Sequence, residues 1–549
     1  MEFKKNQIVE LYIDDIGNEG EGIGHIDGYA LFLKDAVIGD KVHAKIIKTK
    51  KNYGFARVEE VIEASKDRVS PRCSKARQCG GCTLQHLAYE KQLEYKFNKV
   101  KNCLERIGGL ENIEEKMEPI LGMEEPFYYR NKAQFPVGYD KEGNLITGFY
   151  AGRTHHIIDC THCMIQHPVN EQILLKVLDY MKKNNITAYD EKTHKGLVRH
   201  IVTRVGFKTG EIMVCLVVNG SKKNLRNLEM LVDSLTEIEG MTSICVNVNK
   251  EKTNKILGSK IEEVYGKPYI YDYIGNVKYQ IGPLSFFQVN PTQTKVLYEK
   301  AMEYADLKGE ETVWDLYCGI GTISLFLAQK AKKVYGVEIV KEAIDDARLN
   351  AKMNGFDNAE FFVGKAEEVL PREYEKNGVY ADTIVVDPPR KGCDSKLLET
   401  MVKMAPKRIV YVSCDPATLA RDLKVLSEQD YEVEKVCAVD QFSHSSHVET
   451  VVLLSQQKPD DTIEIDLDLD ELDATSAETK ATYQEIKDYV LKEFGLKVSN
   501  LYISQIKRKC GIEVGENYNL PKTENPKVPQ CPKEKEDAIK AALKYFAMI

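Results

Sequence analysis

Between residues 276 and 457, short apolar segments of strand type alternate with segments of helical periodicity. The segments that read as strands are TVWDLYC, KVYGVEIV, AEFFVG, TIVVDPP, RIVYVSC and VETVVLL. Continuous apolar strands separated by helices are typical of a parallel sheet with helices on both faces. The pattern therefore predicts a doubly wound, Rossmann-like α/β domain, with a ligand site at the carboxyl ends of its strands.

The first of these strands leads into a glycine turn. In VWDLYCGIGTISL, a strand is followed by an acidic residue, Asp315, and then by Gly319 and Gly321, where the helix should begin. These glycines allow close approach of the backbone to a ligand, but Ser324 stands where a dinucleotide-binding motif has its third glycine. Glu338, at the end of the next strand, can accept two hydrogen bonds from a ribose diol. Without a full phosphate-binding loop, the pattern favours S-adenosylmethionine over NAD.

Two further strand ends carry reactive side chains. Asp387 begins the sequence DPPRKG, in which prolines stiffen a loop that can hold a planar group. Asp387 can face the cofactor or the substrate, and a plain strand-terminating turn is the alternative. Cys414 lies in YVSCDPATLARDL, where Asp415 and Pro416 end a strand and a helix begins. Position alone leaves Cys414 as a nucleophile, a metal ligand or a small buried side chain.

A group of cysteines precedes this domain. The sequence CSKARQCGGC contains Cys73, Cys79 and Cys82, and its uneven spacing is closer to iron–sulfur patterns than to the paired CxxC of zinc sites. An iron–sulfur site needs a fourth thiolate, and HHIIDCTHCMIQ supplies Cys160 and Cys163. A zinc site and free buried cysteines are the alternatives.

Residues 1–63 contain short strand-like segments between glycine turns, and they predict an OB-like β-barrel of five strands. One stretch of this region combines cations with aromatic rings: Lys45, Lys48, Lys50, Lys51, Tyr53, Phe55 and Arg57. Such a mixture favours RNA binding, because bases stack on the rings while cations contact phosphates. A purely structural β cap is the alternative.

The remaining segments complete the domain organisation. Residues 64–275 mix helix and strand and predict a central α+β domain. Residues 458–479 are strongly acidic and read as an exposed linker. Residues 480–549 predict a small helical appendage, in which the basic run Lys507-Arg508-Lys509 could contact nucleic acid. A plain interaction or folding role is the alternative for this appendage.

Composition narrows the class of protein. The 549 residues are 43% hydrophobic and 29% charged, which is typical of a globular protein. No apolar run approaches the length of a membrane span, and the N-terminal residues turn acidic where a signal peptide needs an apolar segment. We therefore expect a cytoplasmic protein, monomeric and without membrane association. In that setting, fourteen cysteines favour metal binding or catalysis over disulfides. The net charge of −8 argues weakly against nucleic acid, but a basic face remains compatible with it.

Taken together, these segments resemble the RNA uridine-5-methyltransferases, specifically the 23S ribosomal RNA (uracil-5-)-methyltransferases of the RlmD type. The resemblance covers residues 1–457 and is carried, in the family's order, by CSKARQCGGC, FFQVN, DLYCGIG, DPPRKG, SCDPATLARD and HVETVVLL. It implies that residues 1–63 are a TRAM domain and that residues 276–457 bind S-adenosylmethionine. The last 90 residues or so lie outside the resemblance.

The resemblance also implies particular site residues. It implies a 4Fe–4S cluster on Cys73, Cys79, Cys82 and Cys163, the last preferred to Cys160 because CMIQ matches the family's context. With the glycine turn that contains Asp315 and Gly319, it implies a cofactor site that includes Gln288, Tyr317, Glu338 and Asp387. The family's transfer RNA branch lacks the TRAM domain and the cluster, so these features favour ribosomal RNA.

The chemistry of uracil methylation explains why a thiolate and a base are needed. Uracil C5 is a weak nucleophile until a thiolate adds at C6, and a base must later remove the C5 proton. Cys414 is the predicted nucleophile, and helix N-terminal amides at its junction are expected to favour its thiolate. Glu449, in SHVETVV, is the predicted base and matches the family's catalytic glutamate. An edge-strand ion pair is the alternative for Glu449.

The target base must leave its stack to react, so a flipped or single-stranded uridine is expected. Arg130 and Lys132 in YYRNKAQF are candidate RNA contacts, with an ordinary solvated strand as the alternative. Two other functions fit parts of the pattern. One is a methyltransferase for transfer RNA, a protein or a small molecule, and the other is a non-catalytic RNA-binding assembly factor.

Overall fold

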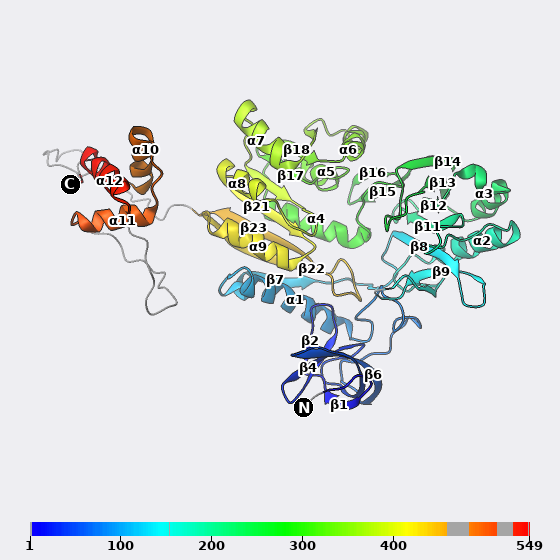
Figure 1. The fold of residues 1–549 in the computed structure, drawn as a ribbon. Helices are drawn as coiled ribbons and strands as arrows, with labels where there is room; N and C mark the ends of the chain where they lie inside the picture. The colour runs from blue at the N-terminus through cyan, green and yellow to red at the C-terminus, as the bar shows by residue number, and fades with distance from the viewer. Residues whose placement is uncertain (1–2, 153, 458–481, 513–530, 547) are drawn as a thin grey trace. The chain divides into compact units, whose positions relative to one another are not determined.

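A computed structural model describes residues 3–152, 154–457, 482–512, 531–546 and 548–549. The chain divides into two compact units, residues 1–458 and residues 459–549 (Figure 1). The acidic segment predicted as a linker, 458–479, lies outside the described residues. None of the helices in the described part of the chain is long and apolar enough to cross a bilayer.

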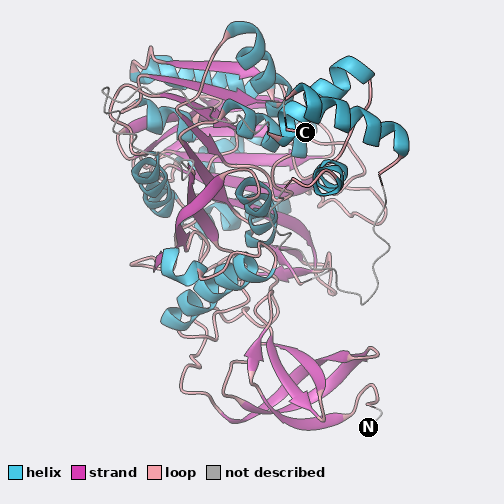
Figure 2. Cartoon of the chain, turned by 90° about the vertical axis from the view of Figure 1, so that its left-hand side faces the viewer, coloured by secondary structure: helices cyan, strands magenta, loops and turns pink. Residues whose placement is uncertain are grey.

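The N-terminal residues form a curled sheet without helices (Figure 2). The sheet has six strands instead of the expected five, because a two-residue strand also pairs at its edge. Their order is β1-β5-β6-β4-β3-β2. Alternate residues of the fifth strand, Val42, Ala44 and Ile46, point into a small apolar core. The strands are β1 (Ile8–Tyr12), β2 (Asp15–Ile16), β3 (Gly22–Ile26), β4 (Tyr29–Lys34), β5 (Lys41–Thr49) and β6 (Tyr53–Glu63).

The central region is a sheet whose order is β10-β9-β8-β11-β12-β13-β14. Its strands are β8 (Lys132–Tyr139), β9 (Leu145–Tyr150), β10 (Ile157–Asp159), β11 (Val198–Val205), β12 (Ile212–Val218), β13 (Met241–Val248) and β14 (Lys260–Gly266). The helices α2 (Val169–Lys183) and α3 (Leu228–Thr236) pack on one face and share one apolar core with it. A short 3-10 turn, η2 (Lys222–Asn224), precedes α3.

The third region contains the α/β sheet that the sequence predicted, in the order β19-β18-β17-β20-β21-β23-β22-β7. Its strands are β7 (Met117–Leu121), β17 (Thr312–Leu316), β18 (Lys333–Glu338), β19 (Ala359–Val363), β20 (Thr383–Val386), β21 (Arg408–Ser413), β22 (Tyr431–Val439) and β23 (Glu449–Gln456). Strands β19 to β21 run parallel, whereas β23 is antiparallel to both β21 and β22.

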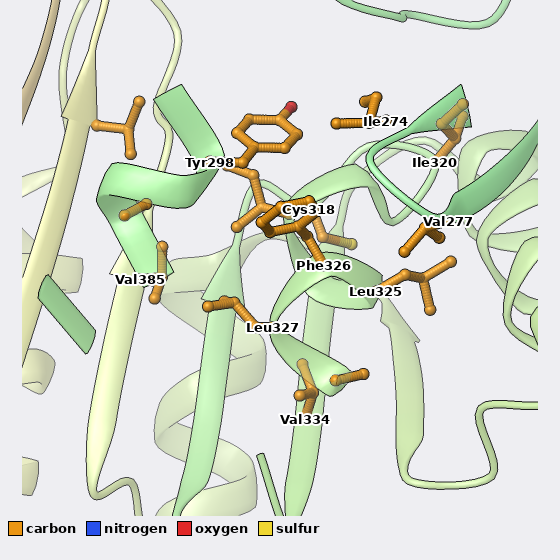
Figure 3. Packing of buried hydrophobic residues seen from close by; sticks show 14 of the residues in the cluster. Ile274, Val277, Tyr298, Cys318, Ile320, Leu325, Phe326, Leu327, Val334 and Val385 are labelled. Atoms are coloured by element: carbon orange, nitrogen blue, oxygen red, sulfur yellow. The ribbon is translucent and has the colours of Figure 1, made fainter. Parts of the chain in front are cut away.

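Helices cover both faces of this sheet, as the continuous apolar strands require. In β20, Val385 faces one core while Ile384 and Val386 face the other. The helices of the first core are α4 (Pro291–Ala305), α5 (Thr322–Ala328) and α6 (Lys341–Asn354). Those of the second are α1 (Tyr89–Arg106), α7 (Ala366–Asn377), α8 (Ser395–Met404) and α9 (Pro416–Ser427). Figure 3 shows the first core, in which Tyr298 and Phe326 pack beside Cys318.

Parts of the sequence before residue 276 also belong to this α/β region. After α1 and the 3-10 turn η1 (Ile113–Lys116), strand β7 pairs in parallel with β22 at the sheet edge. The hairpin β15 (Ile270–Ile274) and β16 (Val277–Ile281) spans the boundary expected at residue 275, and its apolar residues enter the first core. The α/β region is therefore assembled from two separate stretches of chain.

The C-terminal unit contains α10 (Tyr483–Phe494), α11 (Asn500–Lys509) and α12 (Lys533–Tyr545), which share a small apolar core. Thr482 caps α10 and Gly495 ends it, as the sequence predicted. The predicted nucleic-acid contact at 507–509 stays a prediction, for which Arg508 and Lys509 are exposed but Lys507 is buried. The Lys507 side chain is 6% exposed and lies over the ring of Tyr483, and Lys509 pairs with Glu536 at 2.9 Å.

Candidate active site

The strand order of the α/β sheet creates one place for a ligand. The chain proceeds outward from β17 to β19 and then returns to the other side of β17 with β20. Loops leave β17 and β20 in opposite directions at such a switch point, which opens a crevice at the carboxyl ends of the strands. A cavity of about 1130 Å³ lies there, and residues that follow β17, β18, β20 and β21 line it.

The glycine turn after β17 forms one wall of this cavity. Tyr317 has a φ of +72°, which is strained for a residue with a Cβ, and Gly319 has a φ of +56°. The carboxylate of Glu338 accepts hydrogen bonds from the backbone N–H groups of Gly319, at 3.3 Å, and Val340, at 3.0 Å. Tyr317, Gly319 and Glu338 all line the cavity, as does Gln288. With Asp387, the structure thus brings together five of the six predicted cofactor residues.

Asp315 differs from the prediction of a direct cofactor contact. Its side chain is fully buried, does not line the cavity and accepts a hydrogen bond from the Ser324 hydroxyl at 2.5 Å. Burial raises the pKa of Asp315 to about 7. Because Ser324 belongs to α5, the contact joins β17 to the helix that follows the turn. Asp315 therefore stabilises the turn through α5 and does not contact a ligand in the cavity. Its side chain points to α5 because Asp315 lies inside β17 and not at the end of the strand.

Strand pairing brings Cys414 and Glu449 together. Ser413, the last residue of β21, is paired with Thr450 near the start of β23. Since these two strands are antiparallel, the end of one lies beside the beginning of the other, and the residues next to this pair are Cys414 and Glu449. Both line the cavity, together with Asp387 from the end of β20. Glu449 is 3% exposed, and Cys414 is half-buried.

The three side chains lie in an environment that disfavours negative charge. Burial raises the pKa of Glu449 to about 8, and the neighbouring carboxylate of Asp387 raises it further. Burial likewise raises the pKa of Asp387 to about 7. The pKa of the Cys414 thiol is raised to about 11, by burial first and then by the charges of Glu449 and Asp387. Arg390 opposes the shifts at Cys414 and Glu449.

The expected stabilisation of the Cys414 thiolate by helix amides is not found. The Asp415 side chain caps α9 and accepts hydrogen bonds from the N–H groups of Ala417, at 3.0 Å, and Thr418, at 3.1 Å. These amides are therefore occupied by a carboxylate, whose charge also raises the pKa of Cys414. In this arrangement Arg390, an exposed residue of the cavity wall, is the cation that favours the thiolate.

The sequence analysis did not single out Arg390, although its motif, DPPRKG, was part of it. Its signal was a cation two residues after the proline that follows Asp387. Phe286, which is 69% exposed, also lines the cavity, as do Phe442 and His447. Aromatic side chains at an open cavity can stack on a planar base. Phe286 and His447 lie inside FFQVN and HVETVVLL, two motifs that carry the family resemblance, whereas no motif marks Phe442.

The predicted cysteines lie on another wall of the same cavity. Cys79 pairs with Ala151, and the Gly80 N–H donates to the Tyr150 carbonyl at 3.1 Å. These contacts bring the two cysteine-containing segments together. All five candidates line the cavity: Cys73, Cys79, Cys82, Cys160 and Cys163. Within the residues that the structure describes, no three His, Cys, Asp or Glu side chains are grouped so as to hold a single metal ion.

Basic side chains from the central sheet complete the cavity. Arg130 and Lys132, the predicted RNA contacts, both line it. Burial lowers the pKa of Lys132 to about 7, and the nearby charges of Arg204 and Arg130 lower it further. Lys132, the first residue of β8, therefore lines the cavity. It is not on an ordinary solvated strand, which was the alternative interpretation. A polyanion that entered here would favour its charged form.

The fold and the cavity define a Rossmann-like methyltransferase domain joined to an N-terminal β domain. Comparison with known proteins identifies the family. Residues 88–457 match the tRNA (Uracil-5-)-methyltransferase family, and residues 2–58 match the TRAM domain. The chain belongs to the RNA (uracil-5-)-methyltransferase family, whose enzymes transfer a methyl group from S-adenosylmethionine.

Individual relatives agree with this assignment. The chain is 53% identical over 453 residues to an "Uncharacterized RNA methyltransferase" of Clostridium tetani, covering 82% of this chain and 97% of the relative. A protein of the same description from Halalkalibacterium halodurans is 52% identical over 451 residues, with coverage of 82% and 97%. The crystal structure of Pyrococcus abyssi tRNA (uracil-54, C5)-methyltransferase with S-adenosyl-L-homocysteine is 29% identical, has a TM-score of 0.66 and covers 81% of this chain and 100% of its own.

Proposed function

We propose that this enzyme methylates C5 of uracil in 23S ribosomal RNA through a covalent bond between Cys414 and uracil C6. One observation carries the proposal. A thiol and a buried carboxyl of raised pKa meet at the cavity that the cofactor turn also lines. Uracil methylation at C5 needs a nucleophile, a methyl donor and a base in one place.

The proposed reaction begins when the Cys414 thiolate adds to uracil C6. The electron pair of the C5–C6 double bond moves to form an enolate, which makes C5 nucleophilic. Bound S-adenosylmethionine supplies an electrophilic methyl group, which C5 takes. Glu449, as a carboxylate, then removes the C5 proton, and the returning electron pair expels the Cys414 thiolate. The products are 5-methyluridine and S-adenosylhomocysteine, and the enzyme keeps the proton until solvent removes it.

The other cavity residues support this sequence of steps. Glu338 is held by two backbone N–H groups and is placed to accept hydrogen bonds from the cofactor ribose. Asp387, from the end of β20, is assigned to the cofactor or to the uracil. A uridine that is flipped out of its stack could enter beside the aromatic and basic side chains of the wall. Arg390 would lower the energy of the developing thiolate and enolate charges.

Substitution of the two proposed catalytic residues tests the mechanism. Cys414→Ala should lower methylation by at least about 10³-fold, because no other group can activate C5, while S-adenosylmethionine still binds. Glu449→Gln should allow methyl transfer but slow proton removal by about 10²- to 10⁴-fold, so that a protein–RNA adduct accumulates. Denaturing electrophoresis with labelled RNA measures the adduct. Retained turnover in Cys414→Ala, or prompt RNA release in Glu449→Gln, would contradict these roles.

The raised pKa values give a second test. Glu449 accepts a proton only as a carboxylate, so below its pKa of about 8 the active form decreases about tenfold per pH unit. The Cys414 thiolate also increases with pH up to its pKa of about 11. We expect the single-turnover rate of release of methylated RNA, which requires proton removal by Glu449, to increase from about pH 6 to about pH 9. The midpoint near 8 should be absent in Glu449→Gln, and a flat profile for the unaltered enzyme would exclude this assignment.

We further propose that Cys73, Cys79, Cys82 and Cys163 bind a 4Fe–4S cluster. The donor set fits, because five thiols line the cavity and thiolates are the usual ligands of iron–sulfur clusters. The Gly81 N–H donates to the Cys79 sulfur at 3.3 Å, a hydrogen bond typical of cluster ligands. A cluster of four irons separates its ligand sulfurs more widely than one ion does. The proposal is therefore compatible with the absence, among the described residues, of side chains grouped closely enough to hold a single metal ion. The cluster would be structural, because the reaction transfers no electrons.

Metal analysis tests the cluster. Protein purified without oxygen should contain about four irons per chain and absorb at about 400 nm through sulfur-to-iron charge transfer. Cys163→Ser should lose most of this iron, whereas Cys160→Ser, the matched control, should keep it. One zinc per chain without iron would contradict the proposal.

Transfer RNA is the second candidate substrate. The similarity to the Pyrococcus abyssi transfer RNA enzyme covers 81% of this chain, which is more than the methyltransferase family match over residues 88–457. A transfer RNA enzyme therefore resembles more of this chain than its methyltransferase part. The domain composition thus favours ribosomal RNA less strongly than the sequence suggested. A map of 5-methyluridine in a deletion strain separates the two. We expect loss in 23S ribosomal RNA with transfer RNA unchanged, and the reverse result would assign transfer RNA. The monomeric state and the cytoplasmic location stay predictions.

A further inference from the structure

The loop that leads to Glu449 is unusually well anchored. This loop, residues 440–448, connects β22 to β23 and is called the base loop below. Its residue His444 has a φ of +62°, a strained conformation that the surroundings must impose. Helix α1 contacts it through three residues that lie one or two turns apart. The contacts are Tyr89 with Asp440 at 2.7 Å, Lys96 with Asp440 and with the Phe442 carbonyl, and Lys99 with the Ser446 carbonyl at 2.9 Å.

The segment that carries the first three cysteines is the second anchor. This segment, residues 72–87, is called the cysteine loop below. The backbone N–H groups of Thr83 and Leu84, directly after Cys82, both donate to the His444 carbonyl, at 2.8 and 3.0 Å. A shift of the cysteine loop would therefore move the strained residue of the base loop.

The side chain of Gln92, in α1, joins the two loops. Its Nε2 donates to the carbonyls of Leu84, at 3.0 Å, and Leu87, at 2.8 Å, in the cysteine loop. Its Oε1 accepts the His444 N–H of the base loop at 2.9 Å, and its Nε2 also lies 3.2 Å from the imidazole Nδ1. Gln92 is 1% exposed, so water cannot replace these bonds when the side chain is removed.

A stack of side chains provides an independent link. The guanidinium of Arg72, directly before Cys73, lies 4.3 Å from the ring centroid of Phe127. The Phe127 ring in turn lies 4.3 Å from the imidazole of His444. Burial lowers the pKa of His444 to about 4, so its ring is neutral and adds no charge to the stack. The cysteine loop is thus linked to His444 twice, indirectly from Arg72 through Phe127 and directly from Thr83 and Leu84.

We propose that Gln92 is a positioning residue that couples the cysteine loop to the general base, so that an ordered cysteine loop is required for correct placement of Glu449. The inference rests on the proposed function, because it assigns Glu449 as the base and the cysteines as cluster ligands. Its consequence is specific. Disorder in the cysteine loop impairs proton removal from C5 more than it impairs cofactor binding or thiol addition.

The test uses the full-length enzyme and the adduct assay. Gln92→Leu should bind S-adenosylmethionine normally and form the Cys414 adduct, but should resolve it about 10-fold or more slowly. Phe127→Leu, a milder change in the independent link, should slow resolution in the same direction. Asn358→Leu is the matched control, since Asn358 also donates two bonds to carbonyls, those of Ala328 and Ala331, far from the base loop. It should lower the melting temperature without slowing adduct resolution.

Removal of iron from the unaltered enzyme with a chelator tests the same coupling by disordering the cysteine loop instead of changing Gln92. Apoprotein should also accumulate adduct, and reconstitution should restore release. Release at the normal rate from both Gln92→Leu and Phe127→Leu, or from apoprotein, would overturn the inference. If Glu449→Gln itself accumulates no adduct, the proposed function fails. If Glu449→Gln accumulates adduct and Gln92→Leu does not, only the coupling fails.

Discussion

The antiparallel pairing of β21 with β23 is the constraint on which this site depends. The rest of the sheet around the cofactor turn is parallel, and its strand ends alone supply a cofactor site with carboxylates. The one reversed strand beside β21 brings a residue from its own beginning, Glu449, to the edge where Cys414 lies. A nucleophile and a base separated along the chain thereby become neighbours on adjacent strands.

Burial of this pair has a chemical consequence. A carboxyl with a pKa raised to about 8 is a stronger base than an exposed one, and it is surrounded by little water that could compete for the proton. The same environment raises the pKa of Cys414, so the thiolate must be favoured by other charges. Arg390 is the cation placed for this task. The cavity is therefore matched to a reaction in which negative charge moves from sulfur to uracil and back.

Much of this fold could be predicted from the sequence because its signals are local. The apolar strands, the glycine turn and Glu338 can each be recognised from a few neighbouring residues. The same is true of Thr482 and Gly495 at the ends of α10. The cysteines were also found by spacing. Their assembly with the active site into one cavity was not predicted, because it depends on pairing between distant segments such as Cys79 and Ala151.

The failures of prediction have identifiable physical causes. Asp315 was expected at the cofactor, but its place within β17 turns its side chain toward α5. The amides of α9 were expected to serve Cys414, but the adjacent Asp415 competes for them. Strand β7 and the base-loop anchors come from residues before 122, which pack against a domain more than 150 residues later. The places of Asp315 and β7 depend on tertiary neighbours that local sequence does not encode, whereas the capping of α9 by Asp415 is a local contact that the sequence analysis missed.

The central claim is that Cys414 bonds to the uracil ring during methylation. The most direct measurement uses substrate RNA in which 5-fluorouridine replaces the target uridine. Fluorine at C5 cannot leave as a proton does, so the methylated adduct remains bound to the enzyme. Mass spectrometry of the digested complex should find the nucleotide, with one added methyl group, on the peptide that contains Cys414. A nucleotide on another cysteine, or methylation without any adduct, would contradict the account.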